Sequence, residues 1–179
     1  VYEDERFTYA EVAASVRSLA NHLRDAHGVG RGDRVAISMR NFPEWVMTYW
    51  ATVSLGAAVV GMNAWWTSEE MKFGLNDAQP KVVIVDDERL ERLLPVLDEI
   101  RADVALHVMS VRSDRDLPDN CSRWSDVVDA SNAPAELPPA DIDPDDDACI
   151  FYTSGTTGRP KGAQLTHRGC VHNIMNVAA

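Results

Sequence analysis

The chain has 179 residues, with 17 Lys and Arg against 28 Asp and Glu, so its formal net charge is −11. Nucleic-acid binding depends on clustered positive charge, and an acidic chain of this kind predicts no nucleic-acid partner. Hydrophobic residues make up 45% of the sequence, which is ordinary for a globular protein. No apolar run approaches the ~18 residues that would indicate a transmembrane helix.

The cysteines indicate the redox environment. They are odd in number and far apart in the sequence, at Cys121, Cys149 and Cys170. This usage fits a reducing compartment better than a disulfide framework. We therefore expect a cytoplasmic protein, with Cys149 buried inside an apolar strand.

Helical patterns begin early in the chain. Thr8 and Glu11 form a capping box, and apolar residues at helical spacing follow as far as Gly28. A second helix begins near Asn41, which we expect to cap it. Its apolar residues cover most of its circumference, so this helix should be buried on several sides. A third helix begins at Thr67 or Ser68 and ends before Pro80.

Short β-branched runs alternate with these helices, at 34–38, 57–61, 81–85 and 104–109. Between the last two runs the apolar pattern of a further helix contains Pro95, which should kink or divide it. Alternating strands and helices are typical of βαβ units with right-handed crossovers. The sequence therefore predicts an α/β fold, with a mainly parallel sheet flanked by helices on both sides.

We expect a single incomplete domain over 1–179. A βα repeat region at 1–110 is followed by a polar, linker-like region at 111–147 with one amphipathic piece near 124–128. Residues 148–179 then form a strand, a loop, a second strand and the start of a helix. The aspartates between 141 and 147 resemble a calcium loop, but an EF-hand requires Gly at its sixth position and Glu at its twelfth. Counted from Asp141, those positions hold Asp146 and Tyr152, so we favour a solvated linker and assign no metal site.

The segment after the strand at 148–152 carries the clearest chemistry. Its glycines let successive N–H groups form a concave anion site, its hydroxyl groups add donors, and Lys161 adds a positive charge. These residue types suit a polyphosphate: Thr153, Ser154, Gly155, Thr156, Thr157, Gly158 and Lys161. The segment is not a Walker P-loop, because Pro160 precedes the lysine and Gly162 follows it. A flexible surface loop of the same composition is the alternative.

The order of residues from Tyr152 to Gly162 resembles the signature loop of the adenylate-forming superfamily. That superfamily comprises acyl-CoA synthetases, peptide-synthetase adenylation domains and beetle luciferases. Four other segments also resemble the pattern of this superfamily: 32–37, 41–45, 55–60 and 165–167. The resemblance therefore covers most of the chain and is weakest between Ser110 and Pro144. One departure is Gly61, where many members have proline. The pair Trp65 and Trp66 resembles some bacterial fatty-acyl-CoA synthetases, although packing is the favoured role for both side chains.

The resemblance implies an N-terminal fragment of an acid–thiol ligase. Such an enzyme uses ATP and Mg²⁺ to convert a carboxylic acid, here a fatty acid, into an acyl adenylate and then into a thioester with CoA. The seven residues above would bind the ATP phosphates. The adenine, ribose, acyl and CoA sites of the family lie after this loop, so no catalytic residue is assigned and the fragment alone should be inactive. Surfaces exposed by truncation could support an oligomer.

Two alternatives stay open: an amino-acid adenylation domain of a peptide synthetase, and an inactive nucleotide-binding module. A Ser–His–Asp hydrolase is disfavoured because Gly-x-Ser-x-Gly does not occur. His167 follows Thr166 at an expected helix start, which favours capping or packing. The other histidines are scattered and lack the spacing of zinc ligands: His22, His27, His107 and His172.

Overall fold

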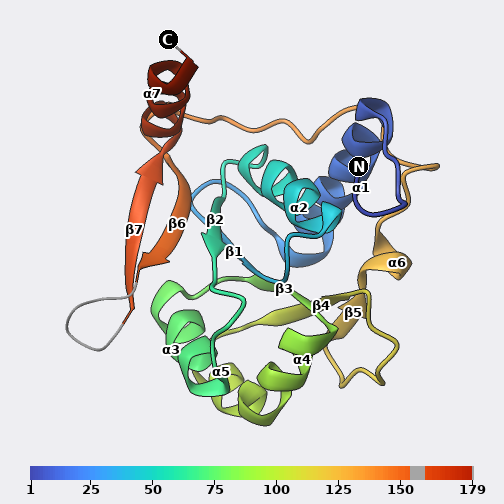
Figure 1. Ribbon diagram of the computed structural model, residues 1–179, viewed down its shortest axis with the longest axis vertical. Helices are drawn as coiled ribbons and strands as arrows, with labels where there is room; N and C mark the ends of the chain where they lie inside the picture. Colours follow the sequence, from blue (N-terminus) through green and yellow to red (C-terminus); the bar gives the residue numbers. More distant parts are fainter. Residues whose placement is uncertain (154–159, 179) are drawn as a thin grey trace.

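The computed structural model describes residues 1–153 and 160–178. Within them, a seven-stranded sheet in the order β5-β4-β3-β1-β2-β6-β7 carries helices on both faces (Figure 1). The strands are β1 (Arg34–Ser38), β2 (Ala58–Gly61), β3 (Val82–Asp86), β4 (His107–Val111), β5 (Cys121–Arg123), β6 (Asp147–Thr153) and β7 (Lys161–Thr166). The helices are α1 (Tyr9–His27), α2 (Pro43–Val53), α3 (Ser68–Ala78), α4 (Asp87–Leu93), the 3₁₀ turn η1 (Leu94–Val96), α5 (Leu97–Asp103), α6 (Trp124–Val127) and α7 (His167–Ala178).

The sheet confirms the predicted α/β class. Neighbouring strands pair in parallel from β5 to β6, and β7 alone runs antiparallel, against β6. The predicted fourth strand begins at His107 instead of Val104, because the Val104 N–H donates to the Ile100 carbonyl and closes α5. The short strand β5 was not predicted, since Cys121–Arg123 lies in a polar region without a β-branched run.

Local capping explains where the helices begin. The Thr8–Glu11 capping box is present at α1, and Thr67 with Glu70 forms a second one at α3. The predicted Asn41 cap of α2 is wrong, because Phe42 occupies that position without a side-chain hydrogen bond. Proline in the first turn starts α2 instead, since its missing N–H would have had no helical partner there.

Two further helix predictions are confirmed, one of them in part. Pro95 divides the fourth helical pattern as expected, because α4 ends at Leu93 and α5 begins at Leu97, with η1 between them. The expected burial of α2 on several sides is confirmed, except along one exposed strip. Met47, Thr48, Ala51, Thr52 and Val53 are buried and Trp45 and Tyr49 are half-buried, whereas Val46 and Trp50 are exposed at 48% and 55%.

The core lies in two layers, one on each face of the sheet. Alternating strand residues face α1 and α2, among them Val35, Ile37 and Val59. The residues between them face α3, α4 and α5, among them Ala36 and Val60. Because both faces are covered, strand β3 is buried along its whole length, as its unbroken apolar run predicts.

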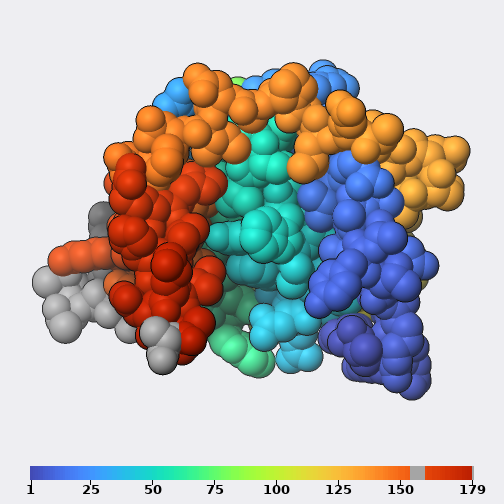
Figure 2. All heavy atoms as spheres, turned by 90° about the horizontal axis from the view of Figure 1, so that it is seen from above, coloured from blue at the N-terminus to red at the C-terminus, as the bar shows by residue number. Residues whose placement is uncertain are grey.

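The segment between α6 and β6 passes along one edge of the molecule, from the region of α1 to that of α7 (Figures 1 and 2). The Arg17 Nε donates to the Pro134 carbonyl at 2.7 Å. Asp146 forms an ion pair with Arg31 at 2.7 Å, and Asp145 pairs with Arg168 at 2.6 Å. These contacts therefore fasten the segment to α1, to the turn between α1 and β1, and to α7. None of the helices in the described ranges is both long and apolar enough to cross a membrane.

Candidate functional site

The candidate phosphate segment lies at the end of a β-hairpin. Strands β6 and β7 pair antiparallel, with Thr153 directly opposite Lys161. The Thr153 hydroxyl donates to the Lys161 carbonyl at 3.5 Å. Both side chains are exposed. The two ends of the segment that the sequence singles out are therefore held side by side.

Five of the seven predicted phosphate ligands lie outside the described residues: Ser154, Gly155, Thr156, Thr157 and Gly158. Thr153 and Lys161 are described. Their assignment to ATP phosphates stays a prediction.

The hairpin continues the parallel sheet at its carboxyl edge. Strand β6 pairs in parallel with β2, with Gly61 opposite Phe151. Thr153 therefore lies at the same edge as the carboxyl ends of β1, β2 and β3. In open α/β sheets, ligands bind in crevices outside this edge. The position of the segment fits a binding loop better than an arbitrary surface loop.

Tyr152 holds the carboxyl end of β6 against α3. Its hydroxyl donates to the Asp77 carboxylate at 2.6 Å, and its ring packs edge-on against Trp66 at 5.3 Å between centroids. Burial and the nearby carboxylate raise the pKa of Tyr152 above its usual value, so the hydroxyl keeps its proton and donates. This contact ties the residue next to Thr153 to the body of the domain.

Replacing Tyr152 by phenylalanine should lower the free energy of unfolding by about 1 kcal/mol, because it removes one hydrogen bond and keeps the ring. Urea denaturation of the full-length protein measures the change. The matched control is Tyr9→Phe, at a side chain that is 96% exposed, where no change is expected. Equal stability of the two variants would show that the Asp77 contact contributes nothing.

Two glycines make room for the aromatic residues around this strand. A Cβ built at Gly61 would lie 2.7 Å from ring carbons of Phe151, and one at Gly74 would lie 2.5 Å from the ring of Trp66. Gly61 therefore has a packing reason for departing from the proline of the family pattern. Trp66 is 6% exposed and fills the space above Gly74, which confirms its packing role. Trp65 is 69% exposed, so packing in the core does not account for it.

A cluster of arginines holds the turn after β2, which the sequence did not indicate. The Arg89 Nε donates to the Ala64 carbonyl at 2.7 Å, and Arg92 donates to the carbonyls of Ala64 and Trp66. The guanidinium groups of Arg40 and Arg89 lie 5.7 and 5.8 Å from the centre of the Trp65 ring. These contacts fix the shape of the carboxyl edge beside the hairpin.

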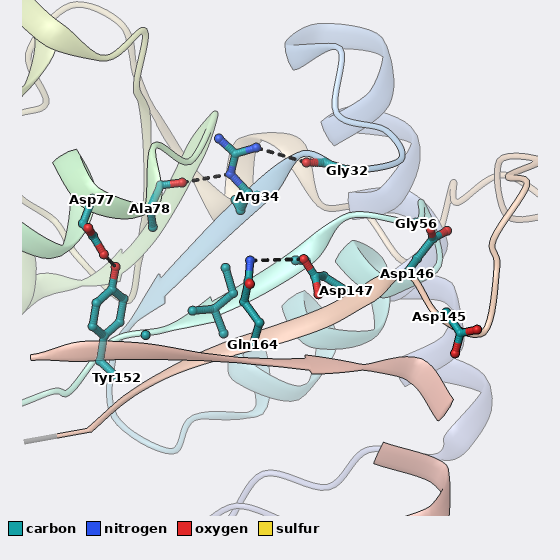
Figure 3. A pocket seen from close by; sticks show the side chains of 13 residues that line it. Gly32, Arg34, Gly56, Asp77, Ala78, Asp145, Asp146, Asp147, Tyr152 and Gln164 are labelled. Carbon is teal, nitrogen blue, oxygen red and sulfur yellow. Dashed lines mark hydrogen bonds between the residues drawn. The ribbon is translucent and has the colours of Figure 1, made fainter. Parts of the chain in front are cut away.

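A cavity of about 510 Å³ lies against the hairpin, on the side that faces α3 (Figure 3). Its walls include four aspartates, Asp77, Asp145, Asp146 and Asp147. The guanidinium of Arg34 also lines it but donates to backbone carbonyls of Gly32, Ala78 and Gln79. A wall of carboxylates repels phosphate. This cavity is therefore not where a polyphosphate would bind.

The smaller candidates have structural roles. Cys149 is 2% exposed, as expected of a core residue. Thr166 caps α7, because its hydroxyl oxygen accepts the Gly169 N–H at 3.1 Å. His167 is the first residue of α7, and its Nε2 atom is buried without a hydrogen-bond partner among the described residues. Packing therefore describes His167 better than capping.

Three histidines that are scattered in the sequence form a stack at the amino end of β4. The ring centroids of His22 and His27 lie 5.1 Å apart, and those of His27 and His107 lie 4.2 Å apart. Burial lowers the pKa of all three, that of His107 to about 4, so the stack is neutral at pH 7. Across residues 1–153 and 160–178, no group of three or more His, Cys, Asp or Glu side chains is placed to hold a metal ion.

Comparisons with known proteins agree with this geometry. The chain is 34% identical over 170 residues to 4-coumarate–CoA ligase 3 of Oryza sativa, covering 95% of this chain and 29% of the relative. It is 34% identical over 177 residues to the long-chain-fatty-acid–CoA ligase FadD13 of Mycobacterium tuberculosis, covering 97% of this chain and 32% of the relative. Among solved structures, ATP-bound MatB from Rhodopseudomonas palustris superposes with a TM-score of 0.76 at 30% identity, covering 97% of this chain and 32% of MatB.

The chain thus spans about a third of the length of the relatives that it matches. The sequence profile of the family described as "AMP-binding enzyme" matches residues 1–179, which is the whole chain. The match agrees with the signature segment, the parallel sheet and the position of the hairpin at its carboxyl edge. We conclude that this chain belongs to the family of AMP-binding, adenylate-forming enzymes.

Proposed function

We propose that residues 153–161 bind the phosphates of ATP in a longer ligase that joins a carboxylic acid to CoA. The observation that carries the proposal is the pairing of Thr153 with Lys161 at the carboxyl edge of the sheet. The similarity to the two CoA ligases and to ATP-bound MatB supports it. The same similarity favours a CoA ligase over an amino-acid adenylation domain.

The proposed reaction has two steps. The carboxylate oxygen of the acid attacks the α-phosphorus of ATP, and the bond to the bridging oxygen breaks, which releases pyrophosphate and leaves an acyl adenylate. The CoA thiol then attacks the acyl carbon, loses its proton, and displaces AMP. Residues 153–161 act in the first step: their N–H groups, hydroxyls and the Lys161 ammonium orient and neutralise the leaving pyrophosphate.

Mg²⁺ is expected to arrive with ATP, bound to its phosphates. Mg²⁺ prefers carboxylate oxygens together with phosphates and water. No carboxylate cluster that could hold a metal is present in the described ranges. The proposal therefore routes no step through the metal.

We propose a fatty acid as the substrate, on the similarity to FadD13 and on the pair Trp65 and Trp66. The similarity to the coumarate ligase is equally high, so the acid needs a direct test. Acid-dependent pyrophosphate exchange by the full-length protein should be faster with palmitate than with coumarate or acetate. A clear preference for coumarate or acetate would overturn the choice of substrate and leave the ligase activity standing.

A cytoplasmic location is proposed from the cysteines, each of which is a free thiol.

Replacing Lys161 by alanine in the full-length protein should slow pyrophosphate exchange about 10- to 150-fold. A charge-assisted contact to phosphate contributes about 1.5–3 kcal/mol, and each 1.36 kcal/mol corresponds to a factor of ten in rate. The side chain is exposed, so the melting temperature should not change. Exchange rates and melting curves of both proteins test this expectation.

The matched control is Lys72→Ala. Lys72 lies on α3 and forms its ion pair with Glu99 of α5. This variant should retain normal exchange. If Lys161→Ala also retains it, the lysine does not contact phosphate, and the proposed role of the segment fails at its most specific residue.

A further inference from the structure

Two cysteine thiols meet at the end of the β6–β7 hairpin that lies away from the candidate phosphate segment. The Sγ atoms of Cys149 on β6 and Cys170 on α7 lie 3.9 Å apart. Cys149 is 2% exposed, whereas Cys170 is only partly buried at the edge of the same core layer. The two residues are separated by 20 others in the sequence, and the fold alone makes them neighbours.

Their positions bracket the hairpin. Cys149 lies in the part of β6 that pairs with β2, so it is fixed to the sheet. Cys170 lies in the first turn of α7, which follows directly after β7. A bond between the two sulfurs would close a covalent loop that contains Thr153 and Lys161.

We propose that Cys149 and Cys170 form a reversible disulfide when the protein meets a peroxide or a small-molecule disulfide. We further propose that this bond slows adenylation, a part that rests on the proposed function. The protein would then carry a redox-controlled modification site within its phosphate-binding hairpin. In a reducing compartment the dithiol form is the resident one, and the disulfide forms transiently.

The chemistry with a peroxide balances in two steps. The Cys170 sulfur attacks one peroxide oxygen and the O–O bond breaks, which gives a sulfenic acid and one water. The Cys149 sulfur then attacks the Cys170 sulfur, the S–O bond breaks, and a second water leaves. Two thiols are oxidised to one disulfide while one hydrogen peroxide is reduced to two waters.

The surroundings of the two thiols indicate which cysteine reacts with the peroxide first. Burial and the neighbouring Cys170 thiol raise the pKa of Cys149 to about 12, so this residue stays protonated. A protonated, buried thiol is a poor first nucleophile. The partly exposed Cys170 is the residue that the oxidant reaches, and Cys149 is the thiol that resolves the sulfenic acid.

We expect formation of the bond to move the hairpin. The two sulfurs are 3.9 Å apart and a disulfide holds them at about 2.05 Å, so the two side chains must approach, and we expect α7 to shift against β6. Because α7 follows β7 without a linker, we expect part of this shift to pass along β7 to Lys161 at its other end. A misplacement of about 1 Å costs on the order of 100-fold in rate. We expect oxidation to reduce pyrophosphate exchange at least tenfold.

The experiment treats the reduced full-length protein with hydrogen peroxide, blocks the remaining thiols with N-ethylmaleimide and digests it with trypsin without reduction. Cleavage after Lys161 and Arg168 separates the two cysteines. Mass spectrometry should find their peptides joined, with the loss of two hydrogens. Dithiothreitol should release the peptides and restore exchange together.

Cysteine variants identify which thiols cause the loss of pyrophosphate exchange after peroxide treatment. Cys170→Ser should keep its exchange rate in the presence of peroxide, whereas Cys121→Ser should lose activity as the unaltered protein does. Overoxidised Cys170 without a joined peptide would overturn the disulfide, and a joined peptide without loss of exchange would overturn its control of adenylation. Failure of the proposed function would give a different result from failure of the disulfide. The fully reduced protein would show no pyrophosphate exchange, whereas the peptide analysis would still detect the Cys149–Cys170 bond.

Discussion

Replacing Arg89 by alanine should lower the free energy of unfolding by about 3–5 kcal/mol, the cost of leaving one partner of a buried ion pair alone. Arg89 is 1% exposed, and its Nη1 lies 3.2 Å from the carboxylate of Asp86, which is 3% exposed. Asp86 also accepts the backbone N–H groups of Arg40 and Arg89. The variant would therefore leave a charged carboxylate in the core and release the turn at Ala64.

Urea denaturation of the full-length protein, followed by tryptophan fluorescence, measures this loss. The matched control is Arg115→Ala, which breaks exposed pairs with Asp87 and Glu91 and should cost less than about 1 kcal/mol. The double variant Asp86→Asn with Arg89→Met removes both charges and should be more stable than Arg89→Ala. Equal losses for Arg89→Ala and Arg115→Ala would contradict a structural role for the buried pair.

Residues 1–179 produced alone should give no measurable acid-dependent pyrophosphate exchange. Adenylation requires ATP and the acid to be held together, and such positioning accounts for an effective concentration of about 10⁵ M or more. The chain spans about a third of its relatives, and its cavity beside the hairpin has acidic walls. A segment that we propose to contact only the phosphates of ATP would not supply that positioning.

The assay compares the fragment with the full-length protein at equal concentration. Exchange by the fragment at a rate near that of the parent would contradict the prediction and would place the whole active site within these residues.

The fragment should also self-associate, because α7 exposes an apolar face in which Ile174 is 68%, Met175 63% and Val177 82% exposed. Sedimentation velocity measures this association, and a monodisperse monomer would count against it.

The sequence by itself determined the elements that depend on neighbouring residues. The capping box at Thr8 needs only a partner three residues away, and Pro95 acts on its own turn, so both were predictable. The unbroken run in β3 likewise indicated a strand with both faces covered. The signature segment at 152–162 indicated the family because its residue order is local.

Only the tertiary structure decided which distant residues meet. Strands β2 and β3 are successive in the chain, yet β1 lies between them, and this order places β6 beside β2. That arrangement sets Phe151 over Gly61, and the packing of α7 on the hairpin brings Cys170 to Cys149. Helix caps and turns depend on residues only a few positions apart in the sequence. Contacts between distant residues depend instead on the order and register of strands across the whole sheet. The local sequence therefore indicated the family, and the fold revealed the pair of thiols at the base of the hairpin.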